Sequence, residues 1–375
     1  MRPDLFSGVF NVARNPVNKS PRSLGVPVAC VSVKHRHILV TRSSRACRMG
    51  WVAGNNNMLW FGPMTLLRLS ASGSSAAPVG PRALGDALEH ALSELPPGAP
   101  VVIMIHGYKF SPRSYRHTPH RHILALRTSK RAPRLISWPR HMRMANGPEN
   151  GLVVAFAWHA RGSVWRAHDR APAAAQALAD VIKRIKARRN GPLDIMAHSL
   201  GARVALSALE QSDANSINRI ILMSGAVFRS DAQRALDSPA GQTAEVINTT
   251  SPENWLFDHL FANLVRPFAF WDTPISAGLR KSRRNWLDIA VSDPATCIAL
   301  AQLGFRIGLP RKRICHWTGY LRPGLFPLYR ALLQNRESWP LHRLREALPV
   351  QCPTIAFEQG LNSINTRRPT TVVGV

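Results

Sequence analysis

One serine in this sequence lies between an apolar run and a helical pattern. Residues 193–197 are mostly apolar, Ser199 follows them, and residues 202–209 have apolar side chains at helical spacing. This order predicts a strand, a sharp turn and a helix. Ala197 and Gly201 are small and leave room for the helix to pack back on the strand. The pattern is typical of a nucleophile elbow, in which the serine has a strained backbone conformation.

Length and composition favour a single catalytic domain with extensions. The 375 residues are 45% apolar, which is enough for one large core. The sequence contains no long uninterrupted apolar run, so we predict no transmembrane segment. The cysteines are odd in number and widely spaced, which argues against a disulfide framework or a zinc site and predicts reduced thiols in a cytoplasmic protein. They are Cys30, Cys47, Cys297, Cys315 and Cys352.

The formal net charge is +28, which raises the possibility of nucleic acid or an anionic membrane surface as partner. Most of the cations are arginines spread along the whole chain, without the spacing of a zinc finger or the signature of an RNA-recognition fold. We therefore predict no specific nucleic-acid partner and interpret the charge as a surface bias toward anions. The sequence leaves the oligomeric state open.

The domain boundaries follow from composition and periodicity. Residues 1–57 contain many arginines and one acid, so we predict a basic extension that is disordered or loosely attached. No apolar segment with a cleavage site begins the chain, which argues against a secretory signal. Residues 58–360 are predicted to form one domain, and residues 361–375 a C-terminal tail.

Within that domain, strand patterns alternate with helical ones. This alternation predicts a doubly wound, mostly parallel sheet of the α/β class. Strands are expected at 58–69, 101–105, 152–158, 193–197, 219–223 and 245–250, helices at 81–95 and 172–189 and directly after Ser199, and a linker at 70–80.

Two insertions interrupt the alternation. Residues 109–150 are basic, rich in histidine and without a clear period, so we expect a segment that covers the site. Residues 255–290 contain many aromatic side chains, which could line an apolar substrate groove or pack in the core or in a lid. His117, His120 and His122 have near-ligand spacing but no nearby carboxylate or cysteine, and we predict an exposed basic loop there instead of a metal site.

A serine nucleophile needs a base and an acid that orients the base. On a sheet of this kind the acid and the histidine follow the serine in the chain. After the strand 245–250, the next loop offers Glu253 and Asp258, and Asp258 is preferred. Asp288 and Asp293 are lesser candidates, and Asp258 could alternatively face solvent or cap a helix.

Three histidines follow Ser199. They are His259, His316 and His342. His259 is adjacent to Asp258 and cannot easily fold back onto it, whereas His316 enters a turn that contains a glycine. We predict His316 as the base. His198 points away from the serine if the strand alternates, so we expect it to pack or to support the site.

The oxyanion of an acyl-transfer reaction needs backbone donors. The amide of Leu200 directly follows the serine at the start of a helix, where the helix dipole favours negative charge. The second donor is expected from the turn 106–108, where Gly107 allows a close backbone approach. We choose the amide of Tyr108 and expect His106 to fix the turn.

Residues 101–108, residues 197–201 and the loop to Asp258 together resemble the alpha/beta-hydrolase superfamily. They are most similar to a bacterial group of largely uncharacterised members with an Ala-His-Ser-x-Gly elbow and a His-Gly-Tyr turn. The resemblance covers about residues 97–330 and implies a doubly wound sheet, a Ser-His-Asp triad and no cofactor or metal. Two departures stand out: Ala197 replaces the first elbow glycine, and Asn254 or Trp255 takes the position that is acidic in relatives.

These features predict a serine hydrolase that cleaves an ester or related acyl bond of a small molecule. Ser199 would attack, His316 would act as base and then acid, and Asp258 would orient it. Leu200 and Tyr108 would bind the oxyanion. The alternative is a catalytically silent binding or scaffold protein with the same fold, which a missing acid would favour.

Overall fold

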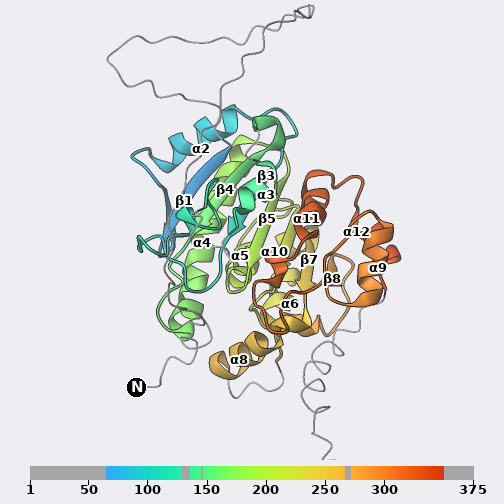
Figure 1. Cartoon of the computed structure of the whole chain (residues 1–375). Helices are drawn as coiled ribbons and strands as arrows, with labels where there is room; N and C mark the ends of the chain where they lie inside the picture. Colours follow the sequence, from blue (N-terminus) through green and yellow to red (C-terminus); the bar gives the residue numbers. More distant parts are fainter. Residues whose placement is uncertain (1–64, 129–135, 145–146, 267–271, 350–375) are drawn as a thin grey trace, which may run out of the picture. The chain divides into compact units, whose positions relative to one another are not determined.

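A computed structural model describes residues 65–128, 136–144, 147–266 and 272–349. These residues form an eight-stranded sheet in the order β2-β1-β4-β3-β5-β6-β7-β8 (Figure 1). The strands are β1 (Leu66–Ser72), β2 (Ser75–Pro78), β3 (Val101–Ile105), β4 (Leu152–Ala157), β5 (Leu193–His198), β6 (Arg219–Met223), β7 (Glu245–Thr250) and β8 (Trp286–Ala290). Only β2 runs antiparallel to its neighbour, which confirms the mostly parallel α/β sheet. The predicted extension 1–57 and tail 361–375 lie outside the described residues.

Helices cover both faces of the sheet (Figure 1). One face packs against α2, α4, α5 and α6. The opposite face packs against α3, α10, α11 and α12. The helices are α2 (Leu84–Ser93), α3 (Trp138–His141), α4 (Val164–Arg188), α5 (Gly201–Glu210), α6 (Arg229–Asp237), α7 (Pro239–Thr243), α8 (Trp255–Val265), α9 (Pro294–Gln302), α10 (Thr318–Leu321), α11 (Leu325–Gln334) and α12 (Leu341–Ala347). No helix in these described segments is long and apolar enough to cross a bilayer.

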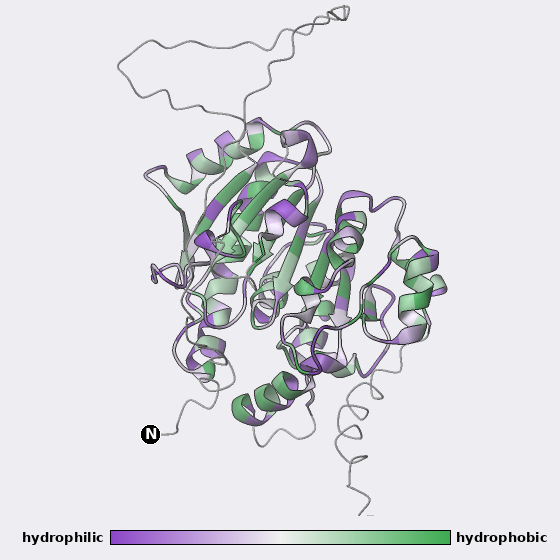
Figure 2. Ribbon diagram, in the orientation of Figure 1, coloured by the Kyte–Doolittle hydropathy of each residue, from purple (hydrophilic) through white to green (hydrophobic). Residues whose placement is uncertain are grey.

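Burial on both faces explains the unbroken apolar runs of the central strands. In β3, Val101, Ile103 and Ile105 face one core, and Val102 and Met104 face the other. Figure 2 shows the same pattern, with apolar colour along the central strands and polar colour on the outer sides of the helices. A parallel sheet covered by helices on both faces requires this composition.

The predicted linker at 70–80 is wrong, because those residues form a β-hairpin at the edge of the sheet. β1 continues to Ser72, turns at Gly73 with a φ of 61°, and pairs with β2. Leu69 lies opposite Pro78 in this pair, and an edge strand tolerates a proline. Backbone pairing stabilises serines and alanines here that have little strand propensity of their own.

The long helix α4 begins well before the predicted start at Pro172. Ser163 caps it by accepting a hydrogen bond from the amide of Arg166. Pro172 therefore lies inside the helix, where it removes one backbone hydrogen bond. Burial of the helix face that carries Ala167, Ala171 and Ala174 offsets that loss.

Both insertions contribute to the fold. The 109–150 insertion contains α3, and it buries Trp138 completely. The 255–290 insertion begins with α8 and ends with β8, a strand that the sequence pattern did not reveal. Part of this insertion lies outside the described residues, including Phe268, Phe270 and Trp271.

Candidate active site

Ser199 lies on the sharp turn between β5 and α5. Its φ is 54°, a conformation that is strained for a residue with a side chain. The amide of Ser199 donates to the carbonyl of Met223 over 3.1 Å, and its own carbonyl accepts from the amide of Ala226 over 3.0 Å. The neighbouring strand and the turn after it therefore hold the serine in this conformation.

Two glycines allow the turn 106–108 to approach Ser199. A Cβ atom on Gly107 would lie 2.6 Å from the Cβ atom of Ser199. A Cβ atom on Gly201 would lie 2.5 Å from the carbonyl oxygen of His106. Both distances are far below van der Waals contact, so glycine is required at both positions. Ala197, in contrast, is accommodated as a buried residue at the end of β5.

The structure brings Ser199 and His316 into contact. The Oγ atom of Ser199 is 2.7 Å from Nε2 of His316. Both side chains are almost fully buried. His316 comes from the loop before α10, far along the chain from the serine. His198 donates from Nε2 to the carbonyl oxygen of His316 over 3.1 Å, and Phe257 stacks on the His316 ring with centroids 4.7 Å apart.

The other nitrogen of His316 bonds to Asn254. Nδ1 of His316 lies 2.7 Å from Oδ1 of Asn254. The amide nitrogen of Asn254 donates to Oδ1 of Asp258 over 2.8 Å. An amide nitrogen can only donate, so the carboxylate fixes the amide with its oxygen toward the histidine. Nδ1 of His316 therefore carries the hydrogen, and Nε2 can accept the proton of Ser199.

The sequence predicts that Asp258 contacts His316 directly, but the side chain of Asn254 lies between them. Asn254 directly precedes α8, and Asp258 lies on the first turn of that helix, four positions later. Residues at this spacing share one helix face, so Asn254 separates the carboxylate from the imidazole. The signal for this was present in the sequence, because Asn254 was one of two residues at the position that is acidic in relatives.

The other acids considered in the sequence have different partners. Asp288 accepts from the amide of Asn248 over 2.8 Å. Asp293 caps α9 by accepting from the amide of Thr296, and Glu253 accepts from the hydroxyl of Ser292. The two remaining histidines, His259 and His342, are exposed.

The turn 106–108 is fixed by His106. The amide of Trp158 donates to Nε2 of His106 over 3.0 Å, and Nδ1 of His106 is 2.8 Å from the carbonyl oxygen of Gly107. The indole nitrogen of Trp158 also donates to the carbonyl oxygen of His106. Burial lowers the pKa of His106 to about 3, so the ring stays neutral and donates from Nδ1. Tyr108 follows, and its hydroxyl donates to the carbonyl of Gly162 over 2.5 Å.

Comparison with known proteins agrees with the fold. Residues 85–231 match a family described as "Alpha/beta hydrolase of unknown function (DUF900)". This match and the sheet place the matched segment in the alpha/beta-hydrolase superfamily. The matched segment contains β3 and the Ser199 turn and ends before Asn254 and His316. No curated protein matches the chain.

The charges at the candidate site are set by burial. Desolvation, together with the neighbouring His198, lowers the pKa of His316 well below its usual value. Burial also lowers the pKa of His198 to about 4 and raises the pKa of Asp258 to about 7. Both imidazoles are therefore neutral near pH 7, where Asp258 is close to the midpoint of its titration.

The described part of the chain contains no cluster of three or more potential metal ligands. The exposed loop predicted at His117, His120 and His122 is wrong for His120, which is buried and bonds to the Ser70 hydroxyl. His122 bonds to the Arg116 carbonyl. Of the cysteines, Cys297 and Cys315 are free thiols. The predicted reduced state of Cys30, Cys47 and Cys352 falls outside the described residues.

Proposed function

We propose that this chain is a serine hydrolase that cleaves an ester or related acyl bond of a small molecule in the cytoplasm. The observation that carries the proposal is the 2.7 Å contact between the Oγ atom of Ser199 and Nε2 of His316. A serine hydroxyl is a weak nucleophile until a positioned base takes its proton. Here the base is neutral, since burial lowers its pKa, and its free nitrogen points at the hydroxyl.

In the proposed reaction, Ser199 attacks the carbonyl carbon of the substrate while Nε2 of His316 takes the hydroxyl proton. His316 then gives this proton to the leaving group as the acyl-enzyme forms. Water attacks the acyl-enzyme while His316 takes a proton from it, and His316 returns that proton to the Oγ atom of Ser199 as the acid is released. The amides of Leu200 and Tyr108 are proposed to bind the oxyanion. Leu200 lies at the start of α5, where the helix dipole adds stabilisation of negative charge.

Asn254 is proposed to orient His316, with Asp258 acting through it. In serine proteases, replacing the triad aspartate by asparagine lowers kcat about 10⁴-fold, because the histidine adopts the wrong tautomer. In this chain Asp258 holds the amide nitrogen of Asn254, which leaves the amide oxygen for Nδ1 of His316. The arrangement therefore supports the tautomer of His316 with its hydrogen on Nδ1, which leaves Nε2 to accept the proton of Ser199, although an amide contacts the ring.

The amide also favours a second candidate function. A neutral Asn254 stabilises an imidazolium less than a carboxylate in direct contact would, as expected for a catalytically silent binding or scaffold protein. On this alternative, Ser199 and His316 would keep their contact for structural reasons only.

A fluorophosphonate probe tests the proposal, because it reacts only with an activated serine. We expect the full chain to be labelled on Ser199 and the Ser199→Ala variant to remain unlabelled. Ser224→Ala is the matched control, since Ser224 is also buried and also has a positive φ of 48°; it should be labelled like the wild type. A folded wild-type chain without label would favour the silent protein.

Among p-nitrophenyl esters, the preferred chain length then reports the depth of the acyl site.

A further inference from the structure

A cavity lies beside the His316 loop. Its volume is about 520 Å³, which is within the usual range for small-molecule sites of roughly 300–1,000 Å³. Cys315 and Trp317 line it, whereas His316 between them turns toward Ser199. Neither Ser199 nor Asn254 is among its lining residues. We call this cavity the α10 pocket, since the residues of α10 and the loops on either side of it form most of its wall.

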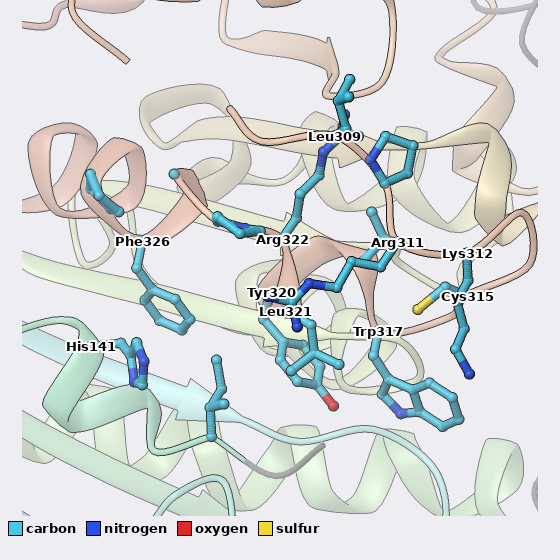
Figure 3. A pocket seen from close by; sticks show the side chains of 16 residues that line it. His141, Leu309, Arg311, Lys312, Cys315, Trp317, Tyr320, Leu321, Arg322 and Phe326 are labelled. Atoms are coloured by element: carbon cyan, nitrogen blue, oxygen red, sulfur yellow. The ribbon is translucent and has the colours of Figure 1, made fainter. Parts of the chain in front are cut away.

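The wall of the α10 pocket is largely apolar. Trp317, Leu321 and Phe326 contribute large apolar side chains, and Leu309 stands at the edge with 86% of its surface exposed. Figure 3 shows Phe326 and His141 at one end of the pocket and Trp317 at the other, with Tyr320 and Leu321 between them. An apolar wall of this kind suits a hydrocarbon chain.

The charged side chains that line the pocket are cationic. Arg311 and Lys312 line it and are exposed. No acidic side chain is among its lining residues, and neither cation forms an ion pair with any described residue. In Figure 3 Arg311 reaches across the pocket toward Tyr320 and Leu321, and Lys312 lies near Cys315 at the Trp317 end. Two cations beside an apolar wall select an anionic head on an apolar tail.

One wall of the pocket is fixed by Arg322. Its guanidinium group donates to the carbonyl of Gly308 over 2.5 Å and to the hydroxyl of Ser292, and the side chain is buried. The bond to Gly308 holds the start of the 308–317 loop against the segment between α10 and α11. The charge of Arg322 is thus directed into the protein, which leaves Arg311 and Lys312 as the groups that can meet a ligand.

We propose that the α10 pocket binds a free single-chain fatty carboxylate. The hydrocarbon chain lies along Trp317, Leu321 and Phe326, and the carboxylate meets Arg311 and Lys312. This site is separate from Ser199, and its occupation does not depend on hydrolysis.

Cys297 and Cys315, the free thiols among the described residues, provide a test in the unmodified full chain. Cys315 lines the pocket, and Cys297 does not, yet both are partly exposed. We expect dodecanoate below its micelle concentration to slow alkylation of Cys315 about tenfold at saturation and to leave Cys297 unchanged, as measured on peptides by mass spectrometry. Dodecyltrimethylammonium, with the same tail and a positive head, should protect neither.

Surface substitutions separate the pocket from its surroundings without touching the core. Leu309→Asp and Lys312→Glu should each raise the dodecanoate concentration for half-protection about tenfold. Ile314→Asp and Arg313→Glu are the matched controls, because both residues are exposed in the same loop but do not line the pocket; they should bind as the wild type does. Ser199→Ala should also bind as the wild type does, whether or not Ser199 is a nucleophile.

Several outcomes would overturn the proposal. Equal protection of Cys315 and Cys297 would indicate nonspecific detergent action, and loss of protection in Ser199→Ala would place the ligand at the candidate active site. Equal protection by the cationic amphiphile would remove the role of Arg311 and Lys312. Dimerisation that Leu309→Asp abolishes, without any binding of dodecanoate, would assign the surface to a second copy of the chain.

Discussion

Replacing Asp258 by leucine should impair catalysis through the orientation of Asn254. The substitution keeps the number and branching of the side-chain heavy atoms but removes the acceptor that lies 2.8 Å from the amide nitrogen of Asn254. The buried amide can then satisfy its nitrogen by turning it toward His316. In that orientation Nδ1 of His316 becomes the acceptor and Nε2 carries the hydrogen, so Nε2 cannot take the proton of Ser199.

The size of the effect follows from the bond that is lost. A hydrogen bond to a charged group contributes about 1.5–3 kcal/mol, and each 1.36 kcal/mol is about a tenfold change in rate. We therefore expect kcat to fall about 10- to 150-fold in Asp258→Leu, with KM unchanged because Asp258 lies behind Asn254. Asp258→Asn keeps a neutral acceptor, whose hydrogen bond contributes about 0.5–1.5 kcal/mol, and should lose only a few-fold.

A rescue experiment separates orientation from damage to the fold. In the double variant Asn254→Asp with Asp258→Leu, a carboxylate contacts His316 directly. Both of its oxygens accept hydrogen bonds, so it cannot present a donor to Nδ1. We expect its kcat at pH 8 to exceed that of Asp258→Leu, in steady-state assays with the preferred p-nitrophenyl ester and with thermal unfolding as the folding control. The reasoning is refuted if folded Asp258→Leu stays within twofold of wild type, or if the folded double variant is no more active than the single one.

Three further predictions concern pH, close packing and buried charge. Because burial raises the pKa of Asp258 to about 7, acidification through pH 7 should lower kcat/KM of the wild type, whereas the profile of Asp258→Asn should lack this step; identical profiles from pH 5 to 9 would contradict it. Gly107→Ala places a Cβ atom 2.6 Å from the Cβ atom of Ser199, so it should lose fluorophosphonate labelling and about 1–3 kcal/mol of stability. Gly85→Ala is the control and should lose neither, because the nearest atom to its Cβ is 3.8 Å away. Arg219 is fully buried, and its partner Glu245 is partly exposed, so Arg219→Met should lower the free energy of unfolding in urea by about 1.5–3 kcal/mol, the contribution of a hydrogen bond to a charged group. A loss as small as that of the exposed Arg184→Met would show that the pair is not needed.

The free energy of unfolding should also depend on the pKa of Asp258. It should fall as the pH rises, whereas kcat/KM should increase. Since the pKa of Asp258 is raised from 3.8 to about 7 in the folded state, the folded chain binds more protons than the unfolded chain between these values. The Asp258 contribution to the unfolding free energy is therefore fully present below pH 4 and is lost as the pH rises through 7. Thermal melts at pH 5 and pH 8 should show a smaller loss in Asp258→Asn than in the wild type.

The sequence by itself determined the central parallel strands. The runs at 101–105, 219–223 and 245–250 are strands with the predicted bounds, because a strand buried on both faces must be apolar throughout and such runs are recognisable without a fold. The strand expected at 58–69 overlaps β1, whereas β2 and the last strand β8 were missed. The residues of β2 have weak strand propensity, and pairing with β1 decides their conformation.

The candidate site divides in the same way. Local sequence indicated the Ser199 turn, since small residues at fixed offsets are a requirement of that turn, and chain order indicated His316 as its partner. Which side chain contacts the other nitrogen of His316 was decided only by the tertiary structure. Asn254 and Asp258 lie one helical turn apart on the same side of the chain, and the angle at which α8 leaves β7 sets which of them meets a ring that arrives from residue 316. Such an angle depends on packing between distant segments, which no local pattern encodes.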